Sequence, residues 1–224
     1  MKLQFRRVGA EALLVEVGDT AAAQATYRVI RSLVADAAVS LAPPRDLVPA
    51  ARTVLLDGVD IDGWRRALDA HAGAIEAERA GSSPSIGRDI TLAIRYDGED
   101  LPIVASTWGC NRDDVIRLHT GARFRVAFCG FAPGFAYCTS DLDVPPMSRR
   151  SEPRANVPAG SVALAGEYCG IYPRAMPGGW QIVGSTPVTM FDATQPEPAL
   201  LQPGDRVRFS PIECPTHEAG DQAP

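Results

Sequence analysis

The sequence predicts an α+β protein in which a small α/β unit is followed by a compact β unit such as a barrel. Strand-like and helix-like patterns alternate over the first eighty residues. A stretch of glycine, serine and proline follows, and short apolar runs separated by glycine and proline dominate the rest. We therefore expect an α/β domain at residues 1–80, a linker at 81–87, a β-barrel domain at 88–212 and a tail at 213–224.

Two pairs of a strand and a helix make up the expected N-terminal domain. Residues 13–17 and 52–56 are short runs rich in leucine and valine, which are typical of strands. Apolar residues recur at helical spacing after each run. Asp19 or Thr20 can cap the first helix, and Asp60 can cap the second. The pattern predicts a small sandwich of helices and sheet.

The expected barrel domain begins with a strand and two short helices. Residues 90–96 alternate as a strand does, and residues 100–108 and 111–119 show helical patterns, with Asn111 as the cap of the second helix. From Phe124 onward the strands are short and the turn residues are frequent. Valine, isoleucine and aromatic residues are interleaved throughout this part, which favours a barrel over disorder.

Composition and charge exclude several classes of partner. The chain is 46% hydrophobic and 22% charged, and its net charge of −5 argues against a broad electrostatic contact with nucleic acid or an anionic membrane. No apolar run has the length of a membrane helix, and the first seven residues lack the apolar stretch of a signal peptide. We expect a cytoplasmic protein that acts on a small-molecule substrate, with no nucleic-acid and no membrane partner.

Lysine and cysteine narrow the chemistry further. Lys2 is the only lysine, which excludes a Walker A loop, an interior Schiff-base lysine and a kinase-type strand lysine. The 5 cysteines contain no CxxC pair, and histidine and the acidic residues show no metal-ligand spacing. We therefore expect no metal site, and we expect most of the cysteines to be buried as small hydrophobic residues.

The densest motif runs from Cys129 to Tyr137. Its glycines and its proline fix an unusual backbone, and its three aromatic residues, Phe131, Phe135 and Tyr137, are spaced so that their rings can surround a pocket. The alternative is a turn that packs its aromatic residues into the core. The residues alone favour neither interpretation strongly.

A second motif concentrates positive charge. Arg149, Arg150 and Arg154 lie within six residues next to stiffening prolines, so they can hold a carboxylate or a phosphate in bidentate geometry. The alternatives are a solvated loop, or pairing of one arginine with Glu152, which would weaken the interpretation as an anion site.

A third motif contains Gly178, Gly179 and Trp180. Two adjacent glycines before a tryptophan allow a ligand or another backbone to approach, with the indole as a wall. The alternative is a hairpin turn that packs one core tryptophan. His119, at the end of a predicted helix, is more often a surface or satisfied histidine than a catalytic one.

These motifs resemble the family of KipI and allophanate hydrolase subunit 1. The matching segments are Gly130-Phe131-x-Pro133-Gly134-Phe135, Pro153-Arg154-x-x-Val157-Pro158-Ala159-Gly160-Ser161-Val162, Cys169-Gly170-Ile171-Tyr172-Pro173, Pro177-Gly178-Gly179-Trp180, Leu118-His119-Thr120 and Leu201-x-Pro203-Gly204-Asp205. The resemblance implies an N-terminal ferredoxin-like domain and a C-terminal cyclophilin-like β-barrel. It also implies a partner chain of the KipA or allophanate hydrolase subunit 2 type.

The resemblance further implies an activity. Bacterial members of the family include the B subunit of an ATP-dependent 5-oxoprolinase, which opens 5-oxoproline to glutamate together with a KipA-type chain and a LamB/YcsF-type chain. We expect this chain to be such a subunit, to share ATP with its partners and to be inactive alone. The alternatives are a regulatory protein that inhibits a sensor histidine kinase, and a carboxyltransferase-like module related to urea carboxylase.

The motifs and the resemblance together suggest the site residues. As catalytic candidates we expect Arg150 and Arg154, which would stabilise a transferring phosphoryl group, and His119. The residues expected to bind substrate are Gly130, Phe131, Pro133, Gly134, Phe135, Tyr137, Pro158, Gly160, Ser161, Tyr172, Gly178, Gly179, Trp180 and Thr186. Ser185 stands where the family usually has an arginine, so a phosphate-binding role carries over less securely.

Overall fold

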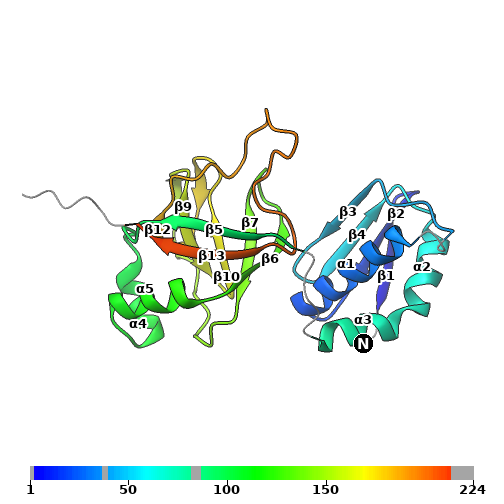
Figure 1. The fold of residues 1–224 in the computed structure, drawn as a ribbon, viewed down its shortest axis with the longest axis horizontal. Helices are drawn as coiled ribbons and strands as arrows, with labels where there is room; N and C mark the ends of the chain where they lie inside the picture. Colours follow the sequence, from blue (N-terminus) through cyan, green and yellow to red (C-terminus); the bar gives the residue numbers. More distant parts are fainter. Residues whose placement is uncertain (1–2, 37–39, 82–86, 213–224) are drawn as a thin grey trace, which may run out of the picture.

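The computed structural model describes residues 3–36, 40–81 and 87–212. Most of the expected linker, residues 82–86, and the expected tail, residues 213–224, lie outside the described residues. Two bodies of secondary structure lie side by side along the long axis of the molecule (Figure 1). In the part of the chain that is described, no helix is both long enough and apolar enough to cross a membrane.

The N-terminal body is a four-stranded antiparallel sheet with the strand order β1-β2-β4-β3. Helices α1, α2 and α3 run alongside this sheet (Figure 1). Its elements are β1 (Gln4–Val8), β2 (Ala12–Glu16), α1 (Thr20–Ala35), β3 (Asp46–Pro49), β4 (Thr53–Asp57), α2 (Ile61–Ala70) and α3 (Ala72–Ala80). Leu13, Val15, Val54 and Leu56 of the central strands pack against Trp64 and Leu68 of α2 in one core.

Helix starts in this body follow the sequence only in part. Asp19 caps α1 as expected, because its carboxylate accepts the Ala22 N–H at 2.8 Å. Asp60 occupies the cap position of α2, but its side chain makes no capping bond. The expected second helix is interrupted at His71, whose backbone leaves the helical conformation with ψ near 12°. There the imidazole Nδ1 and the Ala67 carbonyl are 2.8 Å apart.

The C-terminal body is built on a seven-stranded sheet with the order β12-β9-β10-β7-β6-β13-β5. All of its strand pairs are antiparallel except β13 with β5, which are parallel. Its elements are β5 (Asp89–Ile94), α4 (Leu101–Trp108), α5 (Arg112–Gly121), β6 (Phe124–Cys129), β7 (Ala136–Ser140), β8 (Arg154–Val157), β9 (Ser161–Ala165), β10 (Tyr168–Ile171), β11 (Met176–Gly178), β12 (Gln181–Ser185) and β13 (Arg206–Pro211). Strands β8 and β11 form a separate two-stranded sheet.

The seven-stranded sheet curls until its two edge strands meet. Just beyond β5, Arg95 exchanges two backbone hydrogen bonds of 2.8 Å with Ser185 of β12. Gly184 lies against this seam, and a Cβ there would collide with the Arg95 carbonyl oxygen. The expectation of a mixed α/β protein with a barrel is therefore confirmed at this level: the sheet is a nearly closed barrel with helices.

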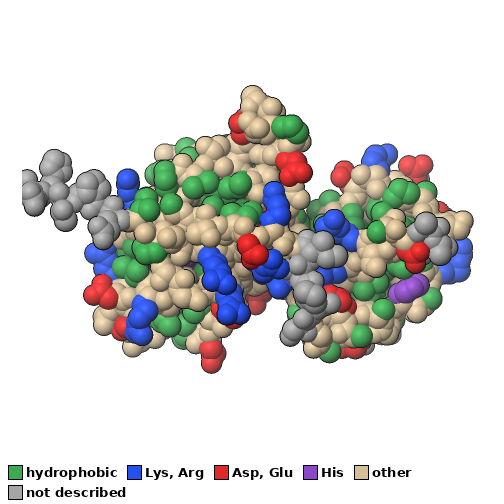
Figure 2. Space-filling view, in the orientation of Figure 1, with side chains coloured by type: hydrophobic (Ala, Val, Ile, Leu, Met, Phe, Trp, Pro, Cys, Tyr) green, Lys and Arg blue, Asp and Glu red, His purple; other side chains and the backbone are tan. Residues whose placement is uncertain are grey.

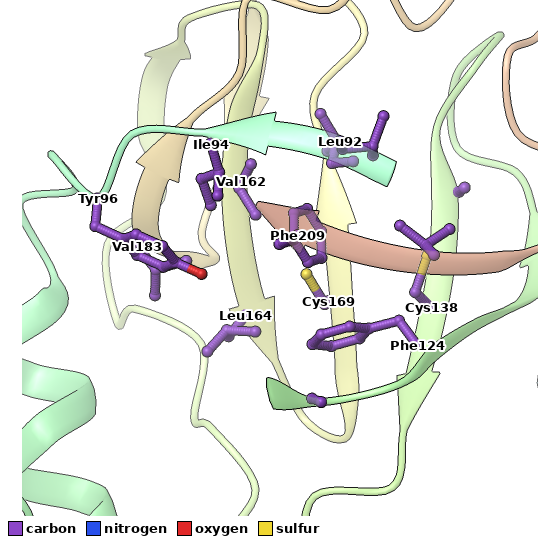
Figure 3. Close-up of a cluster of buried hydrophobic side chains, with 14 of the residues drawn as sticks. Leu92, Ile94, Tyr96, Phe124, Cys138, Val162, Leu164, Cys169, Val183 and Phe209 are labelled. Carbon is purple, nitrogen blue, oxygen red and sulfur yellow. The ribbon is translucent and has the colours of Figure 1, made fainter. Parts of the chain in front are cut away.

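The barrel has an inner and an outer core. Side chains from the whole ring of strands, among them Leu92, Ile94, Val162, Leu164 and Phe209, point into the interior (Figure 3). Alternate residues of the same strands point outward, where Ala163, Ala165 and Ile182 join a second cluster with Val157 and Met176 of β8 and β11. The small two-stranded sheet thus covers part of the barrel's outer face.

Helix α1 joins the two bodies. The Gln24 side-chain amide donates a hydrogen bond to the carbonyl of Ala127 on β6. One turn earlier, the Thr20 hydroxyl donates to the Glu167 carboxylate at 3.2 Å and lies 2.9 Å from the Tyr168 hydroxyl. Gln24 is 6% exposed, so this polar contact is shielded from water.

The seam predicts a specific sensitivity to an added methyl group. Gly184→Ala should lower the free energy of unfolding by about 3 kcal/mol, because the new Cβ must push apart the strands that close the barrel. Urea unfolding measures the change. The matched control is Gly121→Ala at the end of α5, where a Cβ meets nothing within 4 Å. Equal midpoints for the two variants would contradict this account of the seam.

Candidate functional site

Seven aromatic side chains form one continuous cluster on the outer side of the barrel. Within it Phe128 stacks on Tyr137 with ring centroids 4.4 Å apart, and Phe135 meets Trp180 edge to face at 5.5 Å. The members, joined by ring contacts of 4.4 to 5.7 Å, are Phe128, Phe131, Phe135, Tyr137, Tyr168, Tyr172 and Trp180. We call these seven residues the aromatic cluster.

The structure therefore brings together all the aromatic residues expected from the first and third motifs. Phe128 and Tyr168, which were not expected to bind substrate, complete the cluster. Tyr168 precedes the inward-facing Cys169 on β10, so period-two alternation is the signal that points to it. Phe128 has the same parity as the inward-facing Phe124 and Val126, and the register shift between Val126 and Phe128, which alternation does not reveal, turns it outward.

Glycines make room for this cluster. A Cβ on Gly170 would lie 2.8 Å from the Trp180 ring and 3.0 Å from the Phe135 ring. A Cβ on Gly178 would collide with the Tyr172 hydroxyl. The two motif glycines thus permit close packing of rings, which is the packing alternative considered for these motifs.

Phe131 is the exposed end of the cluster. It is 67% exposed, and its backbone has φ +71°, a left-handed conformation that is unfavourable for an aromatic residue. Around it the loop is held by the Gly130 N–H, which donates to the Phe135 carbonyl at 3.1 Å, and by Gly134 with φ +81°. Pro133 is exposed in the same loop. The surrounding loop therefore holds a strained residue that presents an aromatic ring to solvent.

The remaining expected contact residues support the cluster from behind. Gly160 donates its N–H to the Tyr172 carbonyl at 2.7 Å and accepts the Thr186 N–H at 2.8 Å. Ser161 and Thr186 are 4% and 6% exposed, so their side chains do not face solvent. Pro158 precedes this turn, and its carbonyl accepts the Ser161 N–H at 3.3 Å. These residues fix the chain that carries Tyr172.

The arginine motif folds onto a buried carboxylate. Asp100 is 2% exposed and accepts hydrogen bonds from Arg150 at 3.1 Å, from Arg154 at 2.7 Å and from the Ile182 N–H at 2.7 Å. Arg154 also donates to the Glu99 carboxylate at 2.7 Å. We call this set of residues the Asp100 network.

The Asp100 network adjoins the aromatic cluster. The Arg154 guanidinium donates to the Trp180 carbonyl at 3.3 Å, and the Arg150 N–H donates to the carbonyl of Gly179, one residue earlier, at 2.7 Å. The donors of both arginines are therefore directed at groups of this chain. Their expected contact with a phosphoryl group stays a prediction. In this conformation a phosphoryl group would compete with the Asp100 carboxylate for the two guanidinium groups.

Asp100 was not among the expected site residues. It was expected only as the first residue of the helix at 100–108, and in the structure it precedes α4 without a capping bond from its side chain. Its partners Arg150 and Arg154 lie 50 and 54 residues away, and no local pattern reports such a pairing. The signal available was the combination of the acidic pair Glu99 and Asp100 before an apolar helix and a cluster of arginines elsewhere.

Arg149 is the motif arginine that remains open to solvent. Among the described residues it has no hydrogen-bond or ion-pair partner, and its side chain is exposed. Burial raises the pKa of Tyr137 and of Tyr172, and the nearby charge of Arg149 opposes both shifts. A free guanidinium thus lies beside the aromatic cluster.

His119 lies in the barrel interior, apart from the motif arginines. Its Nδ1 is 2.8 Å from the Tyr96 hydroxyl and its Nε2 is 3.6 Å from the Cys169 sulfur. Its ring packs on Phe124 and Phe209, and Cys169 lies beside these two phenylalanines (Figure 3). Full burial lowers the pKa of His119 to about 3, so the imidazole is neutral. His119 is therefore a core histidine with both ring nitrogens in contact with polar groups of the chain.

Metal-binding groups are absent from the described residues. No three histidine, cysteine, aspartate or glutamate side chains there are placed to hold a metal ion. The four described cysteines, Cys110, Cys129, Cys138 and Cys169, are free thiols. Burial raises the pKa of Cys138 and Cys169, so neither thiol is an activated nucleophile.

Comparison with known proteins places the chain in a family. Residues 3–201 match the family described as carboxyltransferase domain, subdomain C and D. The chain belongs to this family. Within this carboxyltransferase-domain family, the chain is 47% identical over 127 residues to the 5-oxoprolinase B subunit of Escherichia coli O157:H7, a match that covers 55% of the chain and 58% of the relative. It is 39% identical over 125 residues to the 5-oxoprolinase B subunit of Bacillus subtilis, a match that covers 54% of this chain and 52% of the relative.

The chain therefore spans little more than half the length of these curated relatives. The resemblance indicated by the motifs is confirmed by their names and by the family match. Among solved structures of this kind, TTHA0988 superposes with a TM-score of 0.68 at 34% identity, covering 92% of this chain and 40% of that one. Kluyveromyces lactis urea carboxylase superposes with a TM-score of 0.67 at 20% identity, and the match covers 94% of this chain and 22% of that one. This likeness shows a shared fold.

The Asp100 network predicts unequal effects of its members on stability. Arg154→Ala should lower the free energy of unfolding by about 3 kcal/mol, because it leaves a buried carboxylate with reduced compensation. Arg149→Ala, next to the same loop and exposed, should change it by less than about 0.5 kcal/mol. Chemical denaturation of both variants measures the difference, and similar losses in the two would show that the network does not stabilise the fold.

His119 predicts a pH dependence of stability. Its folded pKa of about 3 lies below the ordinary value of 6.5, so the unfolded chain binds the proton more readily and stability is lost as the pH falls from 6.5 towards 3. The slope from this group approaches about 1.4 kcal/mol per pH unit. His119→Gln should reduce the slope of unfolding free energy between pH 6.5 and 5, and an unchanged slope would refute the assignment.

Proposed function

We propose that the chain is a subunit of an ATP-dependent 5-oxoprolinase, which opens 5-oxoproline to glutamate together with partner chains. The observation that carries this proposal is the identity of 47% and 39% to proteins named as the B subunit of 5-oxoprolinase. The reaction is a hydrolysis of a cyclic amide, a poor electrophile, and ATP activates it by phosphorylating the carbonyl oxygen so that water can attack.

In this proposal the aromatic cluster is the surface at which the chain meets its KipA-type partner and the substrate. Phe131 gives it an exposed ring, and Arg149 supplies a charge beside it that no described residue neutralises. Exposed aromatic side chains and arginine are the residue types that contribute most to protein interfaces. Phe135, Tyr137, Tyr172 and Trp180 support that surface as its packed base.

The nucleotide is assigned to another chain. The guanidinium groups of Arg150 and Arg154 already donate to Asp100, and the described residues offer no glycine-rich phosphate loop followed by a helix. These residues do not fit a nucleotide phosphate in the conformation observed. We therefore propose that ATP is held by the KipA-type or the LamB/YcsF-type chain, and that this chain is inactive alone.

The finer features of the fold also enter as proposals. The N-terminal sheet order β1-β2-β4-β3, with α1 between β2 and β3 and α2 after β4, corresponds to a ferredoxin-like sheet whose last strand is supplied by β1 at the start of the chain. The nearly closed barrel supports a cyclophilin-like assignment. We propose domain limits of 1–80 and 88–212, joined by 81–87. The free thiols favour a reducing compartment and so the cytoplasm.

A second candidate function has a specific observation in its favour. The family is described as a carboxyltransferase domain, and the fold is shared with Kluyveromyces lactis urea carboxylase. A carboxyl-transfer module would depend on biotin carried by a partner protein, whereas the oxoprolinase subunit would not. Biotin dependence of the assembled complex therefore separates the two candidates.

Reconstitution tests the preferred function. The purified chain with ATP and 5-oxoproline should release no glutamate, and activity should appear when a KipA-type and a LamB/YcsF-type chain are added. Release of glutamate by this chain alone would refute the proposed division of labour, and no activity in the complete mixture would refute the substrate.

A substitution of the exposed Phe131 tests whether the aromatic cluster binds the partner chain. Phe131→Ser should weaken binding of the KipA-type chain about tenfold or more, because the variant removes the solvent-exposed anchor of the aromatic cluster. Ile103→Ser on α4 is the control, since Ile103 is a large hydrophobic side chain, 46% exposed, outside the cluster. Titration calorimetry compares them, and equal affinities would exclude the aromatic cluster as the interface.

A further inference from the structure

A cavity of about 330 Å³ lies where the two bodies meet. Helices α1 and α3 and the residue after α3 form one wall, and β6, β7 and the turn before β10 form the other. Its lining residues are Thr20, Ala21, Gln24, Arg28, Arg79, Gly81, Arg125, Thr139 and Glu167. None of them belongs to the aromatic cluster or to the Asp100 network.

Positive charge is concentrated around this cavity. Three arginines and one carboxylate line it, and a neighbouring cavity of about 540 Å³ shares Arg125 and Thr139 with it. The second cavity adds Arg123, Arg206 and Arg208 against the carboxylates Asp89 and Asp141. Figure 2 shows arginine side chains gathered on the barrel where it approaches the N-terminal body.

Three of the six arginines that line the two cavities have a carboxylate of their own. Arg28 donates to Glu78 at 2.5 Å, Arg79 donates to Asp19 at 2.7 Å, and Arg206 pairs with Asp89 at 2.5 Å. Glu167, the carboxylate in the first cavity, accepts a hydrogen bond from Thr20 at 3.2 Å. Each carboxylate that lines the two cavities thus has a hydrogen-bond partner other than Arg125: Arg206 for Asp89, the Thr20 hydroxyl for Glu167 and the Arg123 backbone N–H for Asp141.

Arg125 differs from its neighbours. Among the described residues its guanidinium has no hydrogen-bond or ion-pair partner, although Arg125 is half-buried as the second residue of β6, whereas Arg123 and Arg208 are exposed. Burial, followed by the charges of Arg28 and Arg206, lowers the pKa of Arg125. A half-buried cation next to like charges, without an anion, is an unfavourable arrangement that a bound anion relieves.

We propose that the cavity between the two bodies binds a small oxyanion, a phosphate or a carboxylate group, through the Arg125 guanidinium. Arg28 adds a second positive charge, and Gln24 of α1 and Thr139 of β7 bring polar side chains from the two opposite walls. The volume is at the lower limit of small-molecule sites, so it suits inorganic phosphate or a small organic acid rather than a nucleotide. Because both bodies line the cavity, the bound anion also strengthens their contact.

Anion titration of the full chain tests the site. Inorganic phosphate and succinate, each at about 10 mM and compared with sodium chloride of equal ionic strength, should raise the melting temperature of the wild-type chain. Calorimetric titration with each anion then gives its affinity. Tighter binding of phosphate identifies a phosphate group as the natural ligand, and tighter binding of succinate identifies a carboxylate.

Three variants make the test specific. Arg125→Gln should weaken binding of the preferred anion at least tenfold, and Thr139→Val should weaken it severalfold while keeping the charge. Arg174→Gln removes an exposed arginine that lines neither of these two cavities, and it should bind as the wild type does. Far-ultraviolet circular dichroism shows whether each variant is folded. If Arg125→Gln does not fold, the loss of anion affinity in Thr139→Val tests the site instead.

The proposal has clear contrary outcomes. Absence of any anion-specific stabilisation of the wild-type chain would overturn it. Equal loss of binding in Arg125→Gln and Arg174→Gln would also overturn it, because the effect would then come from net charge rather than from the cavity.

Discussion

The carboxylate of Asp100 holds together three parts of the barrel that are distant in sequence. It accepts from the arginine loop through Arg150 and Arg154, and from the backbone of β12 through Ile182, at the point where α4 begins. A buried carboxylate is tolerated only with such compensation, so each partner is required by the others. The loop that carries the arginines is thereby fixed against β12, and Trp180, the residue before β12, is fixed beside the other rings of the aromatic cluster.

This arrangement changes how the arginine motif is understood. From sequence, closely spaced arginines indicate an anion site, and the resemblance to a family that uses ATP strengthens that idea. In the fold, two of the three arginines neutralise carboxylates of the same chain, and Arg149 faces solvent. The half-buried cation that lacks a carboxylate among the described residues is Arg125 on β6, a residue with no motif around it. Its position is defined by the packing of two bodies, which no local pattern encodes.

What the sequence predicts well is what local physics controls. The central strands β2 and β4 and the caps Asp19 and Asn111 follow from apolar patterning and side-chain geometry. The edge strands β1 and β3 were not predicted, because they are largely exposed and depend on pairing with their neighbours. His119 shows the same limit: the last turn of its helix points into the barrel, and only the tertiary fold decides that direction. Long-range pairs such as Asp100 with Arg154 have no local signature.

The pairing of β13 has a consequence for biosynthesis. This strand lies between β5 and β6, and Arg206 pairs with Asp89 across a separation of 117 residues. The barrel sheet is therefore incomplete until residue 211 has left the ribosome, whereas the N-terminal sheet needs only residues 4–57. During synthesis the N-terminal body can fold while β5 waits, unpaired along the edge that β13 later covers. An ordered N-terminal body at that stage provides α1 as a ready surface on which β6 and the rest of the barrel assemble.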